Sequence, residues 1–119
     1  MRAIDMHVHP GTKEYLVDAG GKYLSDALHY LHRHDAVVSV EEMAAYYRRL
    51  DMMGVLLAWD AETHTGLPPV TNDYVAGIVK KYPDVFIGFA GVDPWKGAVA
   101  VRELERAVKD LGLRGLKCH

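Results

Sequence analysis

The sequence predicts an α/β fold of parallel strands joined by helices, because apolar segments of strand length alternate with amphipathic segments of helical length. The apolar segments lie at residues 2–8, 55–59, 85–92 and 113–119. Each of the last three follows a segment with helical periodicity, so we expect βαβ units with right-handed crossovers. A continuous apolar run such as 55–59 is typical of a parallel strand that is buried on both faces.

The first strand is expected over residues 2–8, and Pro10-Gly11 stops it. Its apolar members are Ala3, Ile4, Met6 and Val8. Residues 11–38 are mixed in character and carry Gly20-Gly21, so we expect an insertion with a helix over 23–33. The histidines of this insertion are expected to be solvated: His29, His32 and His34.

The next expected helix begins at Ser39, which forms a capping-box pattern with Glu42. Gly54 ends this helix, and its apolar stripe consists of Met43, Ala44, Tyr47, Leu50 and Met53. The strand 55–59 follows directly, and residues 60–69 read as a loop. This segment is the first complete helix-and-strand unit of the predicted fold.

Two further helices are expected between the later strands. Thr71 or Asn72 caps the first of them, and Pro83 closes it. The second runs over 97–111, and Gly112 ends it. Both helices carry apolar residues at helical spacing, which predicts that each packs one face against the sheet.

The composition is that of one soluble globular domain over residues 1–119, with half of the residues hydrophobic and a formal net charge of −2. Neither a basic surface for nucleic acid nor an apolar run long enough to cross a membrane is present in the sequence. Asp5 and His7 interrupt the one candidate for a signal peptide. Cys118 is the only cysteine, so no disulfide can form within the chain, and we expect a cytoplasmic protein.

Two architectures fit the alternation of strands and helices: a barrel and an open, doubly wound sheet. An open sheet that binds a nucleotide usually carries a glycine-rich phosphate loop after its first strand. The first strand here ends in histidines instead. Barrel enzymes place their chemistry at the C-terminal ends of the strands, so the fold class that we predict is the N-terminal half of a (β/α)8 TIM barrel.

The C-terminal end of the first strand carries a candidate metal site. Side chains alternate between the two faces of a strand, so Asp5, His7 and His9 are expected to project from one side. Two imidazoles at positions i and i+2 can converge on one cation, and a zinc ion would accept their nitrogens at roughly 2.0–2.1 Å. We therefore predict that His7 and His9 bind a divalent metal ion.

The ends of the other strands should meet the first one at the same mouth. The second strand ends in Trp59 and Asp60, and the third ends in Asp93, which precedes a proline and suits a turn. Lys117 and His119 lie at i and i+2 on the fourth strand and share one face. Cys118 is expected to point the other way, into the core. Lys117 and His119 are candidate catalytic residues. The candidates for substrate contacts or for support of the metal site are Asp5, Trp59, Asp60 and Asp93.

Three segments resemble the amidohydrolase superfamily. They are residues 4–10 (IDMHVHP), residues 86–94 (FIGFAGVDP) and residues 114–119 (RGLKCH). The branch that they resemble most includes aminocarboxymuconate-semialdehyde decarboxylase, resorcylate decarboxylases and several lactone hydrolases. The resemblance extends over essentially the whole chain.

The resemblance implies a (β/α)8 barrel that holds one divalent ion, usually zinc and sometimes manganese. It makes His7 and His9 the first-strand ligands, and it places Lys117 and His119 in a fourth-strand active-site segment. In the family, further ligands and the acid-base group lie on strands five, six and eight. A complete barrel needs ~250 residues, so this chain would be a fragment, or a half-barrel completed by a C-terminal half or by a homo-oligomer.

The activity implied is hydrolysis of an ester, lactone or amide, or non-oxidative decarboxylation of a small carboxylate. One alternative is a non-catalytic half-barrel that acts as a binding or assembly module. A second alternative is a metal-dependent phosphoesterase or nuclease, because enzymes of these classes also begin with a His-x-His motif. The phosphoesterases normally carry a second Asp-His, which residues 55–61 lack, and the slightly acidic chain does not suit a nuclease. A small-molecule partner is expected, with no nucleic acid and no membrane.

Overall fold

The computed structural model describes residues 1–34 and 36–119, and its centre is a sheet of four parallel strands. The strands are β1 (Ala3–Val8), β2 (Met52–Leu57), β3 (Phe86–Gly91) and β4 (Leu116–Lys117). Each strand pairs with the next one along the chain, in the order β1-β2-β3-β4. A doubly wound sheet reverses its strand order at a switch point, so this unbroken order favours the half-barrel over the open sheet.

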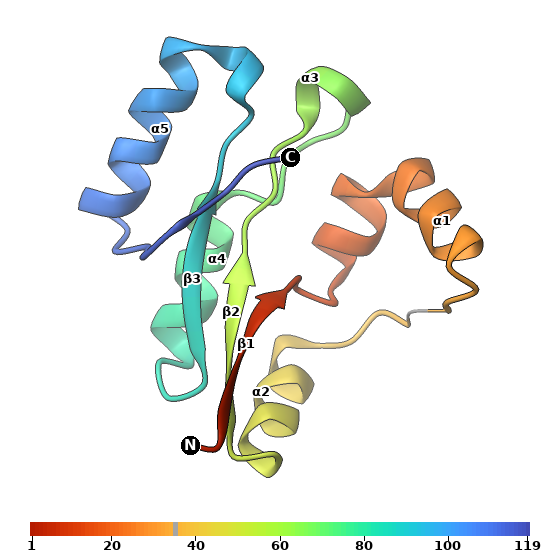
Figure 1. Cartoon of the computed structure of the whole chain (residues 1–119), viewed down its shortest axis with the longest axis vertical. Coiled ribbons are helices and arrows are strands. Elements are labelled where there is room, and N and C mark those ends of the chain that lie inside the picture. Colours follow the sequence, from red (N-terminus) through yellow and green to blue (C-terminus); the bar gives the residue numbers. More distant parts are fainter. Residues whose placement is uncertain (35) are drawn as a thin grey trace.

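Helices follow the strands as Figure 1 shows. Those that connect the strands are α2 (Val40–Arg49), α4 (Asn72–Lys81) and α5 (Ala98–Lys109). Shorter elements complete the fold: η1 (Glu14–Ala19), α1 (Gly21–Tyr30), α3 (Glu62–Thr65) and η2 (Pro94–Lys96). In the described part of the chain no helix is both long enough and apolar enough to cross a membrane. The predicted insertion at 11–38 contains η1 and α1, and its residue 35 lies outside the described residues.

The capping box at the start of α2 is confirmed, because Ser39 accepts a hydrogen bond from the Glu42 amide and Glu42 accepts one from the Ser39 amide. The end predicted for this helix at Gly54 is wrong. The backbone turns at Asp51, which has a φ of 53°, and β2 begins at Met52. Gly54 lies inside β2, where a Cβ atom would sit 3.1 Å from the ring of Tyr47.

The fourth strand is shorter than predicted, since only Leu116 and Lys117 pair with β3. The prediction that Cys118 lies in the core is also wrong, because Cys118 is exposed. β4 is an edge strand that pairs with β3 alone.

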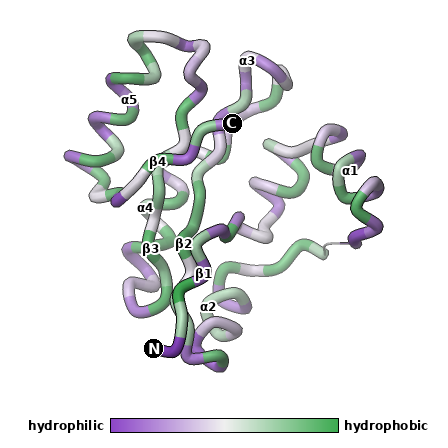
Figure 2. The backbone as a smooth tube through the Cα atoms, viewed as in Figure 1, coloured by the Kyte–Doolittle hydropathy of each residue, from purple (hydrophilic) through white to green (hydrophobic). Residues whose placement is uncertain are grey.

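The hydrophobic core fills the space between the sheet and the helices. In Figure 2, β2 runs through the middle of the molecule and is coloured mostly as hydrophobic. The largest fully buried side chains include Phe86, Leu56, Leu113, Val55 and Val75. Two apolar residues of β1 are not buried: Ile4 is 41% exposed and Met6 is 58% exposed. The sheet is therefore covered on its helical side and partly open on its inner side.

Candidate active site

The two predicted metal ligands lie together at the C-terminal end of β1. The Nε2 atoms of His7 and His9 are 3.2 Å apart. Two nitrogens at this separation, each 2.0–2.1 Å from one zinc ion, would subtend about 100–105° at the ion, close to the tetrahedral angle. The pair therefore fits two positions of one coordination shell.

The environment of His9 keeps its imidazole neutral near pH 7. Its ring stacks on Tyr15 with centroids 4.4 Å apart, and the Trp59 ring lies 6.5 Å away. Burial lowers the pKa of His9 to about 4, and electrostatic interaction with three nearby basic side chains adds to this effect: His7, Lys117 and His119. A metal ion binds the neutral form of imidazole, so the fold holds His9 in the form that a metal needs.

Asp5 does not share the face of the two histidines. The register of β1 against β2 shifts between Asp5 and Val8, which interrupts the alternation of side chains. The Asp5 carboxylate accepts a hydrogen bond from the Tyr47 hydroxyl at 2.9 Å, on the side of α2. It also accepts one from the backbone N–H of His7 at 3.1 Å. Asp5 therefore supports the backbone before the histidines, and does not point beside them.

The end of β4 lies on the same side of the sheet as His9. The ring of His119 is 5.1 Å from that of Trp59, and Lys117 is close enough to affect the pKa of both His9 and His119. The described residues offer no group of three or more His, Cys, Asp or Glu side chains that could hold a metal ion. The described part of the chain thus supplies a pair of ligands without a third.

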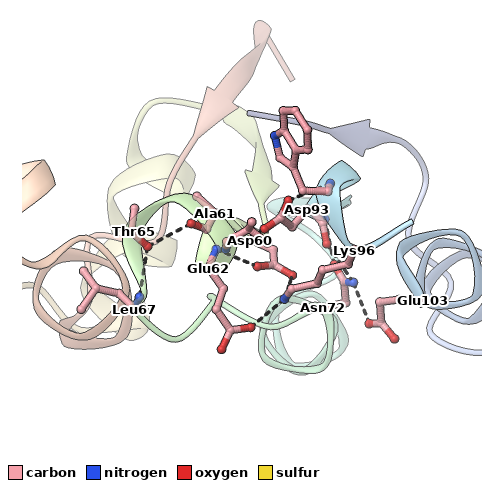
Figure 3. Close-up of polar contacts among 12 residues, drawn as sticks. Asp60, Ala61, Glu62, Thr65, Leu67, Asn72, Asp93, Lys96 and Glu103 are labelled. Atoms are coloured by element: carbon pink, nitrogen blue, oxygen red, sulfur yellow. Dashed lines mark hydrogen bonds and ion pairs between the residues drawn. The ribbon is translucent and has the colours of Figure 1, made fainter. Parts of the chain in front are cut away.

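The other predicted site residues, Asp60 and Asp93, take part in a polar network that fixes α3 (Figure 3). Lys96 lies 2.7 Å from a carboxylate oxygen of Asp60 and 2.7 Å from one of Glu62. Asp93 accepts a hydrogen bond from the backbone N–H of Thr63 at 2.8 Å and another from the backbone N–H of Trp95 at 3.0 Å. The pKa of Asp93 is held below its usual value, chiefly by the hydrogen bonding with Thr63.

Sequence reasoning did not find the role of Lys96. A lysine after a strand is ordinarily solvated, and nothing in the sequence links it to carboxylates more than thirty residues away. The interpretation of Asp93 as a turn residue is confirmed, because its side chain caps η2 by accepting from Trp95.

Asn72 anchors the end of β3 to α4. The sequence predicts Thr71 or Asn72 as the N-cap of α4. Thr71 is the N-cap, because its hydroxyl accepts from the Tyr74 amide, and the Asn72 side chain makes other hydrogen bonds. Its amide accepts from the N–H of Gly91 at 2.8 Å and donates to the Gly91 carbonyl at 3.1 Å. It also donates to Glu103 of α5 at 2.8 Å. Asn72 is only 3% exposed, so these bonds lie in the protein interior.

We expect Asn72→Ala to lower the free energy of unfolding by about 2–3 kcal/mol, because both backbone groups of Gly91 lose their side-chain partner in a buried place. Urea denaturation measures the loss. Asp73→Ala, one residue away and exposed, is the control, and we expect it to cost less than about 1 kcal/mol, since its ion pair with Arg106 is at the surface. Equal stability of Asn72→Ala and wild type would contradict the anchoring role.

A cavity of about 250 Å³ lies at the C-terminal ends of β2, β3 and β4, and we call it the α3 cavity; His7 and His9 do not line it. It is lined by Tyr23, Trp59, Asp60, Ala61, His64, Thr65, Asp93, Trp95 and His119. The buried indole N–H of Trp59 has no hydrogen-bond partner among the described residues. His64 was not among the predicted site residues, because it lies in a segment predicted to be a loop and matches no motif.

The fold and the site together define the N-terminal half of a TIM barrel with an imidazole pair at the C-terminal end of its first strand. The family model described as amidohydrolase matches residues 4–119, so the chain belongs to the amidohydrolase family.

Among the solved structures with a similar fold is one described as a crystal structure of 2,6-dihydroxybenzoate decarboxylase complexed with 2,6-dihydroxybenzoate. It aligns with 95% of this chain at a TM-score of 0.51 and 22% sequence identity. The aligned part is 37% of the length of that protein's chain. No curated protein matches the sequence.

Proposed function

We propose that this chain supplies the first-strand metal ligands and part of the substrate site of a metal-dependent enzyme. The reaction is hydrolysis of an ester, lactone or amide, or decarboxylation of a small carboxylate. The observation that carries the proposal is the 3.2 Å separation of the His7 and His9 Nε2 atoms at a strand end. Membership of the amidohydrolase family supports it, since that family is generally metal-dependent.

His7 and His9 would hold one divalent ion, for which we propose zinc, with manganese as the second choice. Such an ion lowers the pKa of a bound water toward ~7 and polarises a carbonyl group. Burial of His9 against Tyr15 keeps its imidazole unprotonated and fixes the plane of the ring. Trp59, which is 4% exposed, lies on one side of His9 with the ring centroids 6.5 Å apart.

Lys117 and His119 would contact the substrate. Both lie at the end of β4, on the side of His9, and the ammonium group of Lys117 attracts a carboxylate. A small carboxylate is also the ligand named in the description of the structural neighbour. We therefore propose a small carboxylate as the substrate, with Lys117 and His119 as binding groups rather than metal ligands.

Zinc titration of the metal-free chain by calorimetry tests the ligand assignment. We expect His7→Ala and His9→Ala each to weaken zinc binding by about a hundredfold, because either change removes one of two ligands. His29→Ala, an exposed histidine of α1, is the control and should retain wild-type affinity. Lys117→Ala should also retain it. Wild-type affinity in both His7→Ala and His9→Ala would refute the proposed metal site.

A further inference from the structure

The backbone of β1 contains one extra residue just where the histidine pair begins. Between two aligned positions of the ladder, β1 runs from Asp5 to Val8 while β2 runs only from Gly54 to Leu56. An extra residue on one strand is a β-bulge. Residues three apart in a regular strand face opposite sides, yet Asp5 and Val8 both lie toward Tyr47 of α2. A Cβ atom at Gly54 would be 3.2 Å from Val8 and 3.1 Å from the Tyr47 ring, and the Tyr47 hydroxyl donates to Asp5.

The bulge decides the side to which the two imidazoles point. In an unbroken strand, His7 and His9 would share the face of Asp5 and would therefore point toward α2. A shift of one residue moves the side chains that follow it to the other face. The histidines thus leave the side of α2, and their Nε2 atoms come to lie 3.2 Å apart. The geometry of the pair depends on the bulge that precedes it.

The Asp5 carboxylate ties this bulge to α2. Its Oδ1 atom accepts a hydrogen bond from the backbone N–H of His7 at 3.1 Å. Its Oδ2 atom accepts one from the hydroxyl of Tyr47 at 2.9 Å. One carboxylate therefore bridges the first histidine of the pair and a side chain that is forty residues further along the chain.

Tyr47 is a rigid anchor for that carboxylate. It is 8% exposed, and its ring packs edge-on against Phe86 of β3 with centroids 5.6 Å apart. Burial, together with the hydrogen bond to Asp5, raises the pKa of Tyr47, so its hydroxyl keeps its proton and donates. The packed core thus fixes the donor, and the donor fixes the orientation of the carboxylate.

We propose that Tyr47 is a positioning residue for the metal-binding pair: its hydroxyl orients Asp5, and Asp5 holds the backbone of His7 in the bulge. Groups behind a metal ligand commonly set its orientation in this way. Neither Tyr47 nor Asp5 is itself a ligand in this proposal, because Asp5 does not share the face of the two imidazoles. The inference rests on the proposed function for the metal ion that the pair binds.

Amide hydrogen exchange of the metal-free 119-residue chain, followed by NMR, tests the first part of the proposal. Tyr47→Phe removes the hydroxyl and keeps the ring. We expect the His7 amide to exchange about tenfold faster in this variant than in wild type, because Asp5 loses the donor that orients it. Tyr82→Phe is the matched control and should leave that amide unchanged. Tyr82 is 9% exposed, and its hydroxyl also donates to a carboxylate, that of Glu41, at 2.9 Å.

Zinc titration of the same variants by calorimetry tests the second part. We expect Tyr47→Phe and Asp5→Ala each to weaken zinc binding by about tenfold, a usual effect of losing a group that orients a ligand. Tyr82→Phe should retain wild-type affinity. Asp5→Asn keeps an acceptor for the His7 amide but not the charge, so it should retain most of the affinity. Adding Tyr47→Phe to Asp5→Ala should cause no further loss, because both residues act through one path. Circular dichroism checks that each variant is folded.

Undiminished protection of the His7 amide in folded Tyr47→Phe would overturn the proposal. Where zinc binding depends on the histidine pair, wild-type affinity of Tyr47→Phe would overturn it as well. Equal weakening by Asp5→Asn and Asp5→Ala would also overturn it, since the carboxylate would then act through its charge.

Failure of the metal proposal has a different signature. Zinc would then bind equally well to wild type, His7→Ala and His9→Ala. The exchange rate of the His7 amide in the metal-free chain would in that case decide alone whether Tyr47 positions this part of β1.

Discussion

Replacing Phe86 with alanine should lower the free energy of unfolding by about 3–5 kcal/mol, the usual cost of removing a buried aromatic ring. Phe86 is 1% exposed and lies on the helical side of β3. Its ring packs edge-on against Tyr47 of α2 and against Tyr82 after α4, with centroids 5.6 Å and 6.4 Å away. A loss of this size is a large part of the 5–15 kcal/mol that typically stabilises a domain. Urea denaturation followed by circular dichroism measures it.

Phe89→Ala is the matched control, because Phe89 lies in the same strand on the opposite face. Its ring covers the backbone of Gly115, where a Cβ atom would come within 2.6 Å, but it is only partly buried. We expect a loss of about 1–2 kcal/mol. Equal losses for the two variants would contradict an open inner face, since they would mean that this side of the sheet is covered in solution.

The elements of the fold could be predicted wherever one local signal determines them. Ser39 and Glu42 cap each other across one turn, so the start of α2 is visible in the sequence. Val55 to Leu57 are apolar and buried, as a strand covered on both faces requires. The end of α2 was missed because Gly54, an ordinary helix stop, is needed inside β2 for the close approach of Tyr47.

The histidine pair could be predicted from its spacing alone, whereas its surroundings could not. The irregularity between Asp5 and Val8 turns Asp5 toward Tyr47, and no local pattern in the sequence indicates a bulge there. His64 and Lys96 belong to segments without periodicity or motif. Their placement depends on contacts between the ends of different strands, and such contacts exist only after the sheet has formed.

The metal-free chain should lose stability as the pH falls from about 6.5 toward 4, because of His9. Burial and the neighbouring basic side chains lower the pKa of His9 to about 4 in the folded protein, whereas an unfolded chain gives histidine its usual pKa near 6.5. Between these values the unfolded state binds the extra proton. The free energy of unfolding therefore falls with decreasing pH in this window, by up to about 3 kcal/mol in total.

Other groups also titrate below pH 6.5, so the measurement is a difference between variants. Urea denaturation with chelator at pH 7.0, 5.5 and 4.5 should show a shallower pH dependence for His9→Gln, which cannot be protonated, than for wild type. The control is His29→Gln, which removes an exposed histidine, and we expect this variant to show the same pH dependence of stability as wild type. Parallel pH profiles for His9→Gln and wild type would show that His9 is not held neutral by the fold. The basis for regarding it as a preformed metal ligand would then be lost, because an imidazole that protonates freely gains nothing from its burial beside Tyr15.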